Sequence, residues 1–202
     1  MLLEIQSLLN RSNYKTYTRP FELNIVGVRA DSIKPNAFDD SINVFYKTND
    51  GKWQLHRFPA TTDPGTYWLK NMMNSKGTAI VKEGQYIGSH GIGMHRGKYL
   101  ALTQKRPLTV IRDYNRDTVL DFMNGKEETG IFGINIHHAS AWGTTPTVDK
   151  YSAGCQVFAN INDFNLFMQL AQRHKQLYGN DFTYTLVDER ALARQQKKTA
   201  VA

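Results

Sequence analysis

The residues best suited to chemistry lie between Gly133 and Asp163, where a histidine closes an apolar run ahead of a cysteine. The segment reads GINIHHASAWGTTPTVDKYSAGCQVFANIND, and Cys155 is the only cysteine of the chain. A free thiol is only slightly ionised at neutral pH, so a cysteine nucleophile needs a nearby base. We predict Cys155 as nucleophile and His137 as base. An intramolecular disulfide is excluded, and a small buried apolar side chain is the alternative role for the thiol.

Small residues lead into the cysteine as Ser152-Ala153-Gly154-Cys155. Gly154 can adopt backbone conformations closed to other residues and leaves room beside the thiol. The backbone N–H groups of Gly154 and Cys155 are therefore predicted donors to the oxyanion that forms on an attacked carbonyl. Gly154 joins Cys155 and His137 in the predicted catalytic set.

This segment resembles the catalytic domain of the L,D-transpeptidase (YkuD-type) family, which carries a histidine, an intervening segment and then Ser/Thr-His-Gly-Cys. Here fourteen residues separate His137 from Ser152. Ile136-His137-His138 stands where the family often has Ile-His-Gly. An Asn and an Asp often follow ahead of a helix, as Asn160 and Asp163 do here. A looser similarity extends over roughly residues 80 to 190.

The resemblance implies an L,D-transpeptidase-like fold and an enzyme that attacks a carbonyl of a peptidoglycan stem peptide. Cys155 would form a thioester, His137 would act as base, and Ser152 would be a structural member of the motif. The acyl group would then pass to an amine (transpeptidation) or to water (hydrolysis), and the sequence leaves the acceptor open. We expect no cofactor and no metal.

The sequence departs from the family at two positions. Ala153 replaces the histidine between Ser and Gly, and Val157 replaces a polar residue two positions after the cysteine. The second change bears on recognition of a substrate carboxylate. Ser-Ala-Gly-Cys-Gln variants are associated with phage and prophage proteins, so a phage virion component or lysis protein is an expected setting. A non-catalytic virion or wall-binding protein that keeps the fold is the alternative.

His138 is the rival to His137, and on a strand the two side chains would point to opposite faces. His138 could instead line the substrate groove, or its backbone carbonyl could orient the His137 ring. Asp149 is a weaker candidate for that orienting role. Tyr86 and Trp142 are candidate walls of the groove because aromatic faces pack on sugar rings and peptide backbones.

Two further histidines, His90 and His95, lie in the glycine-rich segment GSHGIGMHRG. We expect this segment to be a loop, either at the lip of the groove or plain surface. Together with His137, His138 and Cys155 these side chains could in principle bind zinc, but the sequence has no His-Glu-x-x-His pattern.

The remainder of the sequence predicts one mainly β domain with a few helices, either a sandwich or a partly closed barrel. We divide residues 1–202 into an N-terminal helix (1–15), a catalytic domain (about 20–190) and a basic tail (191–202). Asn49-Asp50-Gly51 predicts a hairpin turn. A helix is expected from near Asp163, with Asn162 or Asp163 as N-cap, ending at Gly179.

The net charge of +7 favours a polyanionic partner such as an anionic bacterial wall. We expect bacterial peptidoglycan and other phage virion proteins as partners. Nucleic acid is not expected, because no nucleic-acid-binding motif accompanies the charge. No apolar run is long enough to predict a membrane span. The N-terminus lacks secretory signal features, so we expect synthesis in the cytoplasm and another route to the cell wall.

Overall fold

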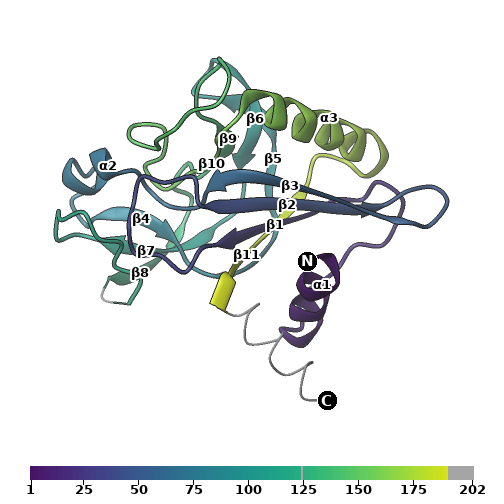
Figure 1. Ribbon diagram of the computed structural model, residues 1–202, viewed down its shortest axis with the longest axis horizontal. Coiled ribbons are helices and arrows are strands. Elements are labelled where there is room, and N and C mark those ends of the chain that lie inside the picture. The colour runs from purple at the N-terminus through teal and green to yellow at the C-terminus, as the bar shows by residue number, and fades with distance from the viewer. Residues whose placement is uncertain (124, 191–202) are drawn as a thin grey trace.

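The computed structural model describes residues 1–123 and 125–190 (Figure 1). The basic tail predicted at 191–202 lies outside the described residues. Along the chain the elements are α1 (Leu2–Arg11), β1 (Asn24–Arg29), β2 (Asp40–Lys47), β3 (Trp53–Thr61), α2 (Thr66–Lys70), β4 (Thr78–Val81), β5 (Gly84–His95), β6 (Tyr99–Gln104), β7 (Leu108–Asp113), β8 (Lys126–Gly130), β9 (Ile136–His138), β10 (Gln156–Phe158), α3 (Ile161–Tyr178) and β11 (Phe182–Asp188).

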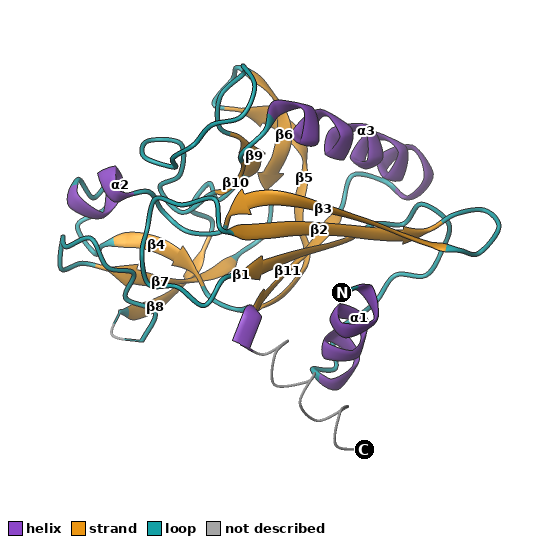
Figure 2. Ribbon diagram, in the orientation of Figure 1, coloured by secondary structure: helices purple, strands orange, loops and turns teal. Residues whose placement is uncertain are grey.

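Eight strands pair in a ring, in the order β1-β11-β5-β6-β9-β10-β3-β2, and β2 pairs again with β1. The pairs β1–β11 and β9–β10 are parallel, and the other pairs of the ring are antiparallel. A smaller sheet, β4-β7-β8, lies beside the ring on the side away from α3 (Figure 2). The prediction of a mainly β fold with a few helices is confirmed.

The main apolar cluster takes residues from all eight strands of the ring, including Ile25, Leu102 and Tyr184. Phe164 and Phe167 of α3 pack into the same cluster. Burial of this area supplies most of the driving force for folding, at roughly 25 cal/mol per Å² of apolar surface.

A second cluster lies on the other face of β1, where α1 packs through Ile5, Leu8 and Leu9. Val26 and Val28 of β1 join this cluster. Because β1 is covered on both faces, all six of its residues are buried and its sequence lacks polar alternation. The N-terminal helix predicted over 1–15 spans Leu2–Arg11.

The hairpin predicted at Asn49-Asp50-Gly51 is confirmed. The Thr48 N–H donates to the Lys52 carbonyl at 2.8 Å, and Gly51 adopts a positive φ of 79°. The turn joins β2 to β3, which pair over their full length from Lys47 opposite Trp53.

Helix α3 begins earlier than the sequence indicated. Its N-cap is Asn160, whose side-chain oxygen accepts the Asn162 N–H at 2.7 Å, so the N-cap prediction of Asn162 or Asp163 was wrong. Asn160 has the extended backbone of an N-cap residue. Its side chain supplies an oxygen that accepts a hydrogen bond at the start of the helix. Gly179 ends the helix as predicted, with a φ of 93°.

The glycine-rich segment expected to be a loop is instead part of the long strand β5, so that prediction was wrong. A Cβ on Gly93 would lie 2.5 Å from Thr103 Oγ1, and one on Gly91 would lie 2.9 Å from the Asn180 carbonyl oxygen. These glycines therefore permit the close approach of neighbouring segments rather than flexibility. As a result β5 carries His90 and His95 at fixed positions.

Candidate active site

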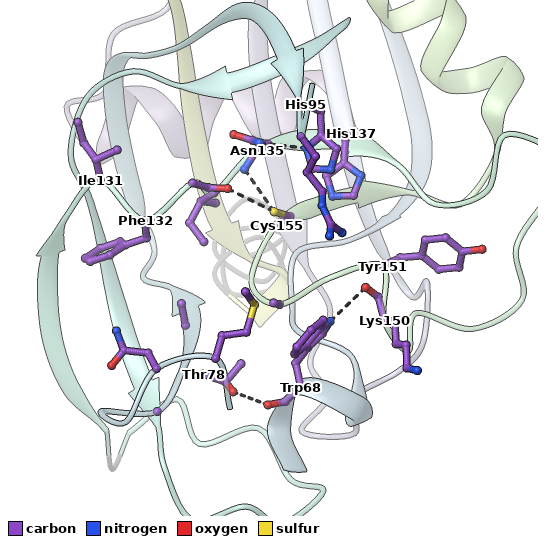
Figure 3. A pocket seen from close by; sticks show the side chains of 18 of the residues that line it. Trp68, Thr78, His95, Ile131, Phe132, Asn135, His137, Lys150, Tyr151 and Cys155 are labelled. Atoms are coloured by element: carbon purple, nitrogen blue, oxygen red, sulfur yellow. Dashed lines mark hydrogen bonds between the residues drawn. The ribbon is translucent and has the colours of Figure 1, made fainter. Parts of the chain in front are cut away.

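The two residues predicted to perform the chemistry line one pocket of about 630 Å³ (Figure 3). Strands β9 and β10 lie side by side in parallel, with Val157 opposite His137. Cys155 comes immediately before β10, next to Asn135, which comes immediately before β9. The pairing of two short strands thus brings together residues separated by the long polar loop. Other pocket residues come from α2, β4, the β5–β6 turn and the loops, among them Trp68, Ala79, Arg96, Phe132, Lys150 and Tyr151.

The thiol of Cys155 is partly buried and protonated at rest. Its Sγ accepts the Asn135 N–H at 3.4 Å and lies 3.6 Å from the Gly133 carbonyl oxygen, toward which the S–H donates. Burial raises the pKa of Cys155 to about 11, and the Asn135 N–H and the charge of Arg96 oppose that rise. A base is therefore required for reaction at neutral pH.

His137 is buried, and its tautomer is fixed by its own chain. Its Nδ1 lies 2.8 Å from the backbone carbonyl oxygen of His138. A carbonyl can only accept, so Nδ1 carries the proton and Nε2 keeps its lone pair. The Tyr99 hydroxyl donates to the same carbonyl at 3.3 Å. Burial, with a smaller contribution from His95, lowers the pKa of His137 to about 3, so the ring is neutral. Within residues 1–123 and 125–190 no hydrogen bond joins His137 to Cys155.

His95, which the sequence placed only in a segment that could form the lip of the groove, lines the pocket itself. Its ring stacks on that of His137, with centroids 4.0 Å apart and planes 26° apart. Figure 3 shows the two imidazoles side by side, on the same side of the thiol. Burial, followed by the charge of Arg96, lowers the pKa of His95 to about 4. The position of His95 on strand β5 could have indicated its place in the site, but the glycines of β5 made the segment look like a loop.

Asn135 connects the thiol to the stacked rings and was missed. Its backbone N–H contacts Sγ of Cys155, and its side-chain Nδ2 donates to Nδ1 of His95 at 3.0 Å. Its Oδ1 accepts the Gln104 N–H at 3.0 Å, which anchors the side chain to β6. The sequence signal for Asn135 was its spacing of two residues from His137, because residues two apart on a strand point to the same face.

The turn before Cys155 has the expected small residues but a different hydrogen-bond pattern. The Ser152 hydroxyl donates to the Cys155 carbonyl at 2.8 Å and accepts the Gly154 N–H at 3.2 Å. The prediction of Gly154 N–H as an oxyanion donor is therefore corrected, since that donor is occupied. Gly154 is required for shape: its φ is 120°, and a Cβ would lie 2.5 Å from the Ala79 carbonyl oxygen. The Cys155 N–H has no acceptor among the described residues.

His138 faces away from the pocket. Its ring stacks on Tyr99 at 4.1 Å between centroids and contacts Phe164 of α3. It lines a separate shallow groove with residues of α3. Its contribution to the site is the backbone carbonyl that holds the His137 ring, which was one of the alternatives drawn from the sequence.

The two predicted aromatic walls lie outside the pocket, so this prediction was wrong for both. The Tyr86 hydroxyl donates to the Lys82 carbonyl at 2.5 Å and its ring packs against the main core. Trp142 is 85% exposed in the polar loop. Neither residue could be placed from sequence, because aromatic type alone does not reveal the facing direction. The observed aromatic walls are Trp68, Phe132 and Tyr151.

Two further candidates also lie elsewhere. Asp149 accepts from the Thr147 hydroxyl at 2.9 Å and does not contact His137. His90 is fully buried; its Nε2 donates to the Ile134 carbonyl at 3.0 Å and its Nδ1 accepts from Ser89. The side chains of Asp149 and His90 therefore make hydrogen bonds that stabilise the fold.

In the described part of the chain no three His, Cys, Asp or Glu side chains are placed to hold a metal ion. No helix there is both long and apolar enough to cross a membrane. No protein-family model, curated protein sequence or solved structure matches this chain. The function is therefore argued from the site.

Proposed function

We propose that this protein is a cysteine-dependent acyl-transfer enzyme that acts on peptidoglycan stem peptides, with an L,D-transpeptidase-like fold. One observation carries the proposal: the only cysteine of the chain shares a pocket with a buried histidine whose Nδ1 is held by a backbone carbonyl, and whose Nε2 has no hydrogen-bond partner among the described residues. The resemblance of the Cys155 segment to the L,D-transpeptidase family supplies the substrate class.

In the first step Nε2 of His137 accepts the thiol proton while Sγ of Cys155 attacks an amide carbonyl carbon. A tetrahedral intermediate forms, and its collapse breaks the C–N bond. The proton on His137 passes to the leaving amine, which leaves a thioester on Cys155. An amine or water then attacks the thioester, with His137 again as base, and restores the thiol.

The pocket supports this sequence of steps in three ways. The Cys155 N–H, which has no acceptor among the described residues, is the proposed oxyanion donor, and a single well-placed donor is worth about 10²–10³ in rate. The Asn135 N–H, already directed at Sγ, stabilises developing thiolate charge. Trp68, Phe132 and Tyr151 provide apolar walls for a peptide.

The test is to incubate the protein with purified peptidoglycan and with a stem tetrapeptide. Mass spectrometry should show an acyl adduct on Cys155 and altered muropeptides. Cys155→Ser should give neither. Identical muropeptide profiles for wild type and Cys155→Ser would contradict the proposal.

A second candidate is a non-catalytic virion or wall-binding protein that retains the fold. Two observations favour it: burial raises the pKa of Cys155 to about 11 and lowers that of His137 to about 3, which opposes proton transfer between them, and the Gly154 N–H is occupied. This candidate predicts peptidoglycan binding that survives Cys155→Ser, with no adduct in either protein. A phage virion or lysis protein remains the setting that we propose for either function.

A further inference from the structure

The pocket around Cys155 has an uneven charge. Three cationic residues line it, Arg96, Arg112 and Lys150, and the described lining contains no aspartate or glutamate. Arg112 is neutralised, because its guanidinium pairs with Glu128 at 2.8 Å and donates to the Gly77 carbonyl. The excess positive charge therefore comes from Arg96 and Lys150.

Arg96 occupies the tight turn between β5 and β6, directly after His95. It is exposed, has a positive φ of 51°, and forms no ion pair within the described residues. Arg96 lines the same pocket as Cys155, His95 and His137. A guanidinium binds carboxylates through two parallel hydrogen bonds, and no residue in the described part of the chain occupies this fork.

Lys150 lies across the pocket in the loop that leads to Cys155. Its carbonyl accepts the Trp68 indole N–H at 3.1 Å, which ties this part of the loop to α2. Its ammonium lies over the Tyr67 ring at 4.3 Å and pairs with no carboxylate in the described structure. In Figure 3, Trp68, Lys150 and Tyr151 lie together, apart from His95 and His137.

We propose that Arg96, with a longer-range contribution from Lys150, forms a subsite for a carboxylate on the acyl donor in the pocket that Cys155 lines. Arg96 is the principal specificity-determining residue, and Lys150 adds to the field. The subsite replaces the polar side chain missing at Val157, which is fully buried and cannot reach a ligand. This inference rests on the proposed function for its physiological ligand, but the anion subsite itself can be tested without turnover.

The test compares two alkylating reagents of the same shape, anionic iodoacetate and neutral iodoacetamide. In both reactions the thiolate displaces iodide and a C–S bond forms. Labelling is specific because Cys155 is the only cysteine. Any change in the thiolate fraction alters both rates equally, so the ratio of the iodoacetate rate to the iodoacetamide rate isolates attraction of the carboxylate.

We expect Arg96→Gln to lower this ratio by about 3- to 10-fold, and Lys150→Gln to lower it by about 2-fold, because both charges are partly screened by solvent. Arg96→Lys should recover most of the ratio. Lys98→Gln is the matched control: it removes one charge from the same turn but not from the pocket lining, and should lower the ratio less than Arg96→Gln does. Added salt should reduce the wild-type ratio toward that of Arg96→Gln.

An unchanged ratio in both Arg96→Gln and Lys150→Gln would overturn the subsite. An equal fall in Lys98→Gln would also overturn it, since the effect would then come from net charge. A ratio that depends on Arg96 in a protein that never acylates with stem peptide would retain the subsite and reject the proposed function. If the subsite serves the stem peptide, a tetrapeptide with a free carboxylate should protect Cys155 from iodoacetamide better than its amide, and Arg96→Gln should remove that difference.

Discussion

Two polar regions of this molecule differ in how their hydrogen bonds are completed. One surrounds Arg29 and Asp63 at the ends of β1 and β3. Arg29 pairs with Asp63 at 2.9 Å and donates to the carbonyls of Thr62 and Val81. Asp40 accepts the Ala30 N–H and both the N–H and the hydroxyl of Thr62.

The other region is the pocket around Cys155. Here Nε2 of His137, the Cys155 N–H, and the charged groups of Arg96 and Lys150 have no hydrogen-bonding or carboxylate partner in the described structure. Unpaired polar groups cost stability when they are buried, so a cluster that satisfies itself supports the fold. Groups that stay open toward a cavity are available to a ligand. The contrast separates polar residues that build this fold from those that we assign to chemistry.

The sharpest contrast comes from Cys155→Ser. We expect loss of acylation by at least about 10³-fold, because a hydroxyl is a far weaker nucleophile beside a neutral imidazole. The free energy of unfolding should change by less than about 1 kcal/mol, since the thiol makes only weak contacts. Intact-mass spectrometry and urea denaturation measure the two quantities. A large stability loss would mean that the thiol has a packing role.

Asp63→Ala should show the opposite pattern. Removing one partner of a buried ion pair leaves Arg29 without its nearest carboxylate, which costs about 3–5 kcal/mol. Urea denaturation measures this loss, and labelling of Cys155 by iodoacetamide should be unchanged in the folded protein. Asp31→Ala is the control, because its pair with Arg190 is exposed and should contribute less than about 1 kcal/mol. Equal effects in the two variants would remove the distinction between the regions.

Acid should destabilise the pocket through its neutral histidines. Burial lowers the pKa of His95 to about 4, whereas the unfolded residue titrates near its usual value of about 6.5. Between these values the unfolded state binds more protons, so this contribution to stability is present above pH 6.5 and is lost as the pH falls toward 4.

The stability difference between wild type and His95→Asn should therefore shift against wild type by about 1–2 kcal/mol from about pH 7 to about pH 4.5. Urea denaturation at both pH values tests this. Asp63, whose pKa is raised to about 7 by burial, acts in the opposite direction but cancels because both proteins retain it. His56→Asn, with a less buried ring, is the control and should shift less. No shift for His95→Asn would contradict a neutral His95.

The smallest expected effect is that of Ser152→Ala. Its hydroxyl holds the turn through the Cys155 carbonyl and the Gly154 N–H. Loss of both hydrogen bonds should cost about 1–2 kcal/mol and free the Gly154 N–H. Thermal unfolding measures the first effect, and the rate of Cys155 acylation measures the second. A full loss of activity with intact stability would instead place Ser152 among the reacting groups.

The features that could be predicted from the sequence are those that a short segment determines by itself, without long-range pairing. The turn at Asp50-Gly51, the α3 helix up to Gly179 and the pair His137 and Cys155 all belong to this class. His95 was assigned to a loop because glycines that admit close neighbours look the same in sequence as glycines of a loop. Tyr86 and Trp142 were misplaced because a side chain's facing direction depends on register, which long-range pairing sets.

The most direct test of the central claim compares His137→Ala with His138→Ala during acylation of Cys155 by a thiol-directed acylating inhibitor at neutral pH. We predict that His137→Ala abolishes acylation. His138→Ala should retain it, because the His138 group that holds the His137 ring is a backbone carbonyl, which the substitution leaves in place. Acylation that survives in His137→Ala and is lost in His138→Ala would contradict the assignment of the base.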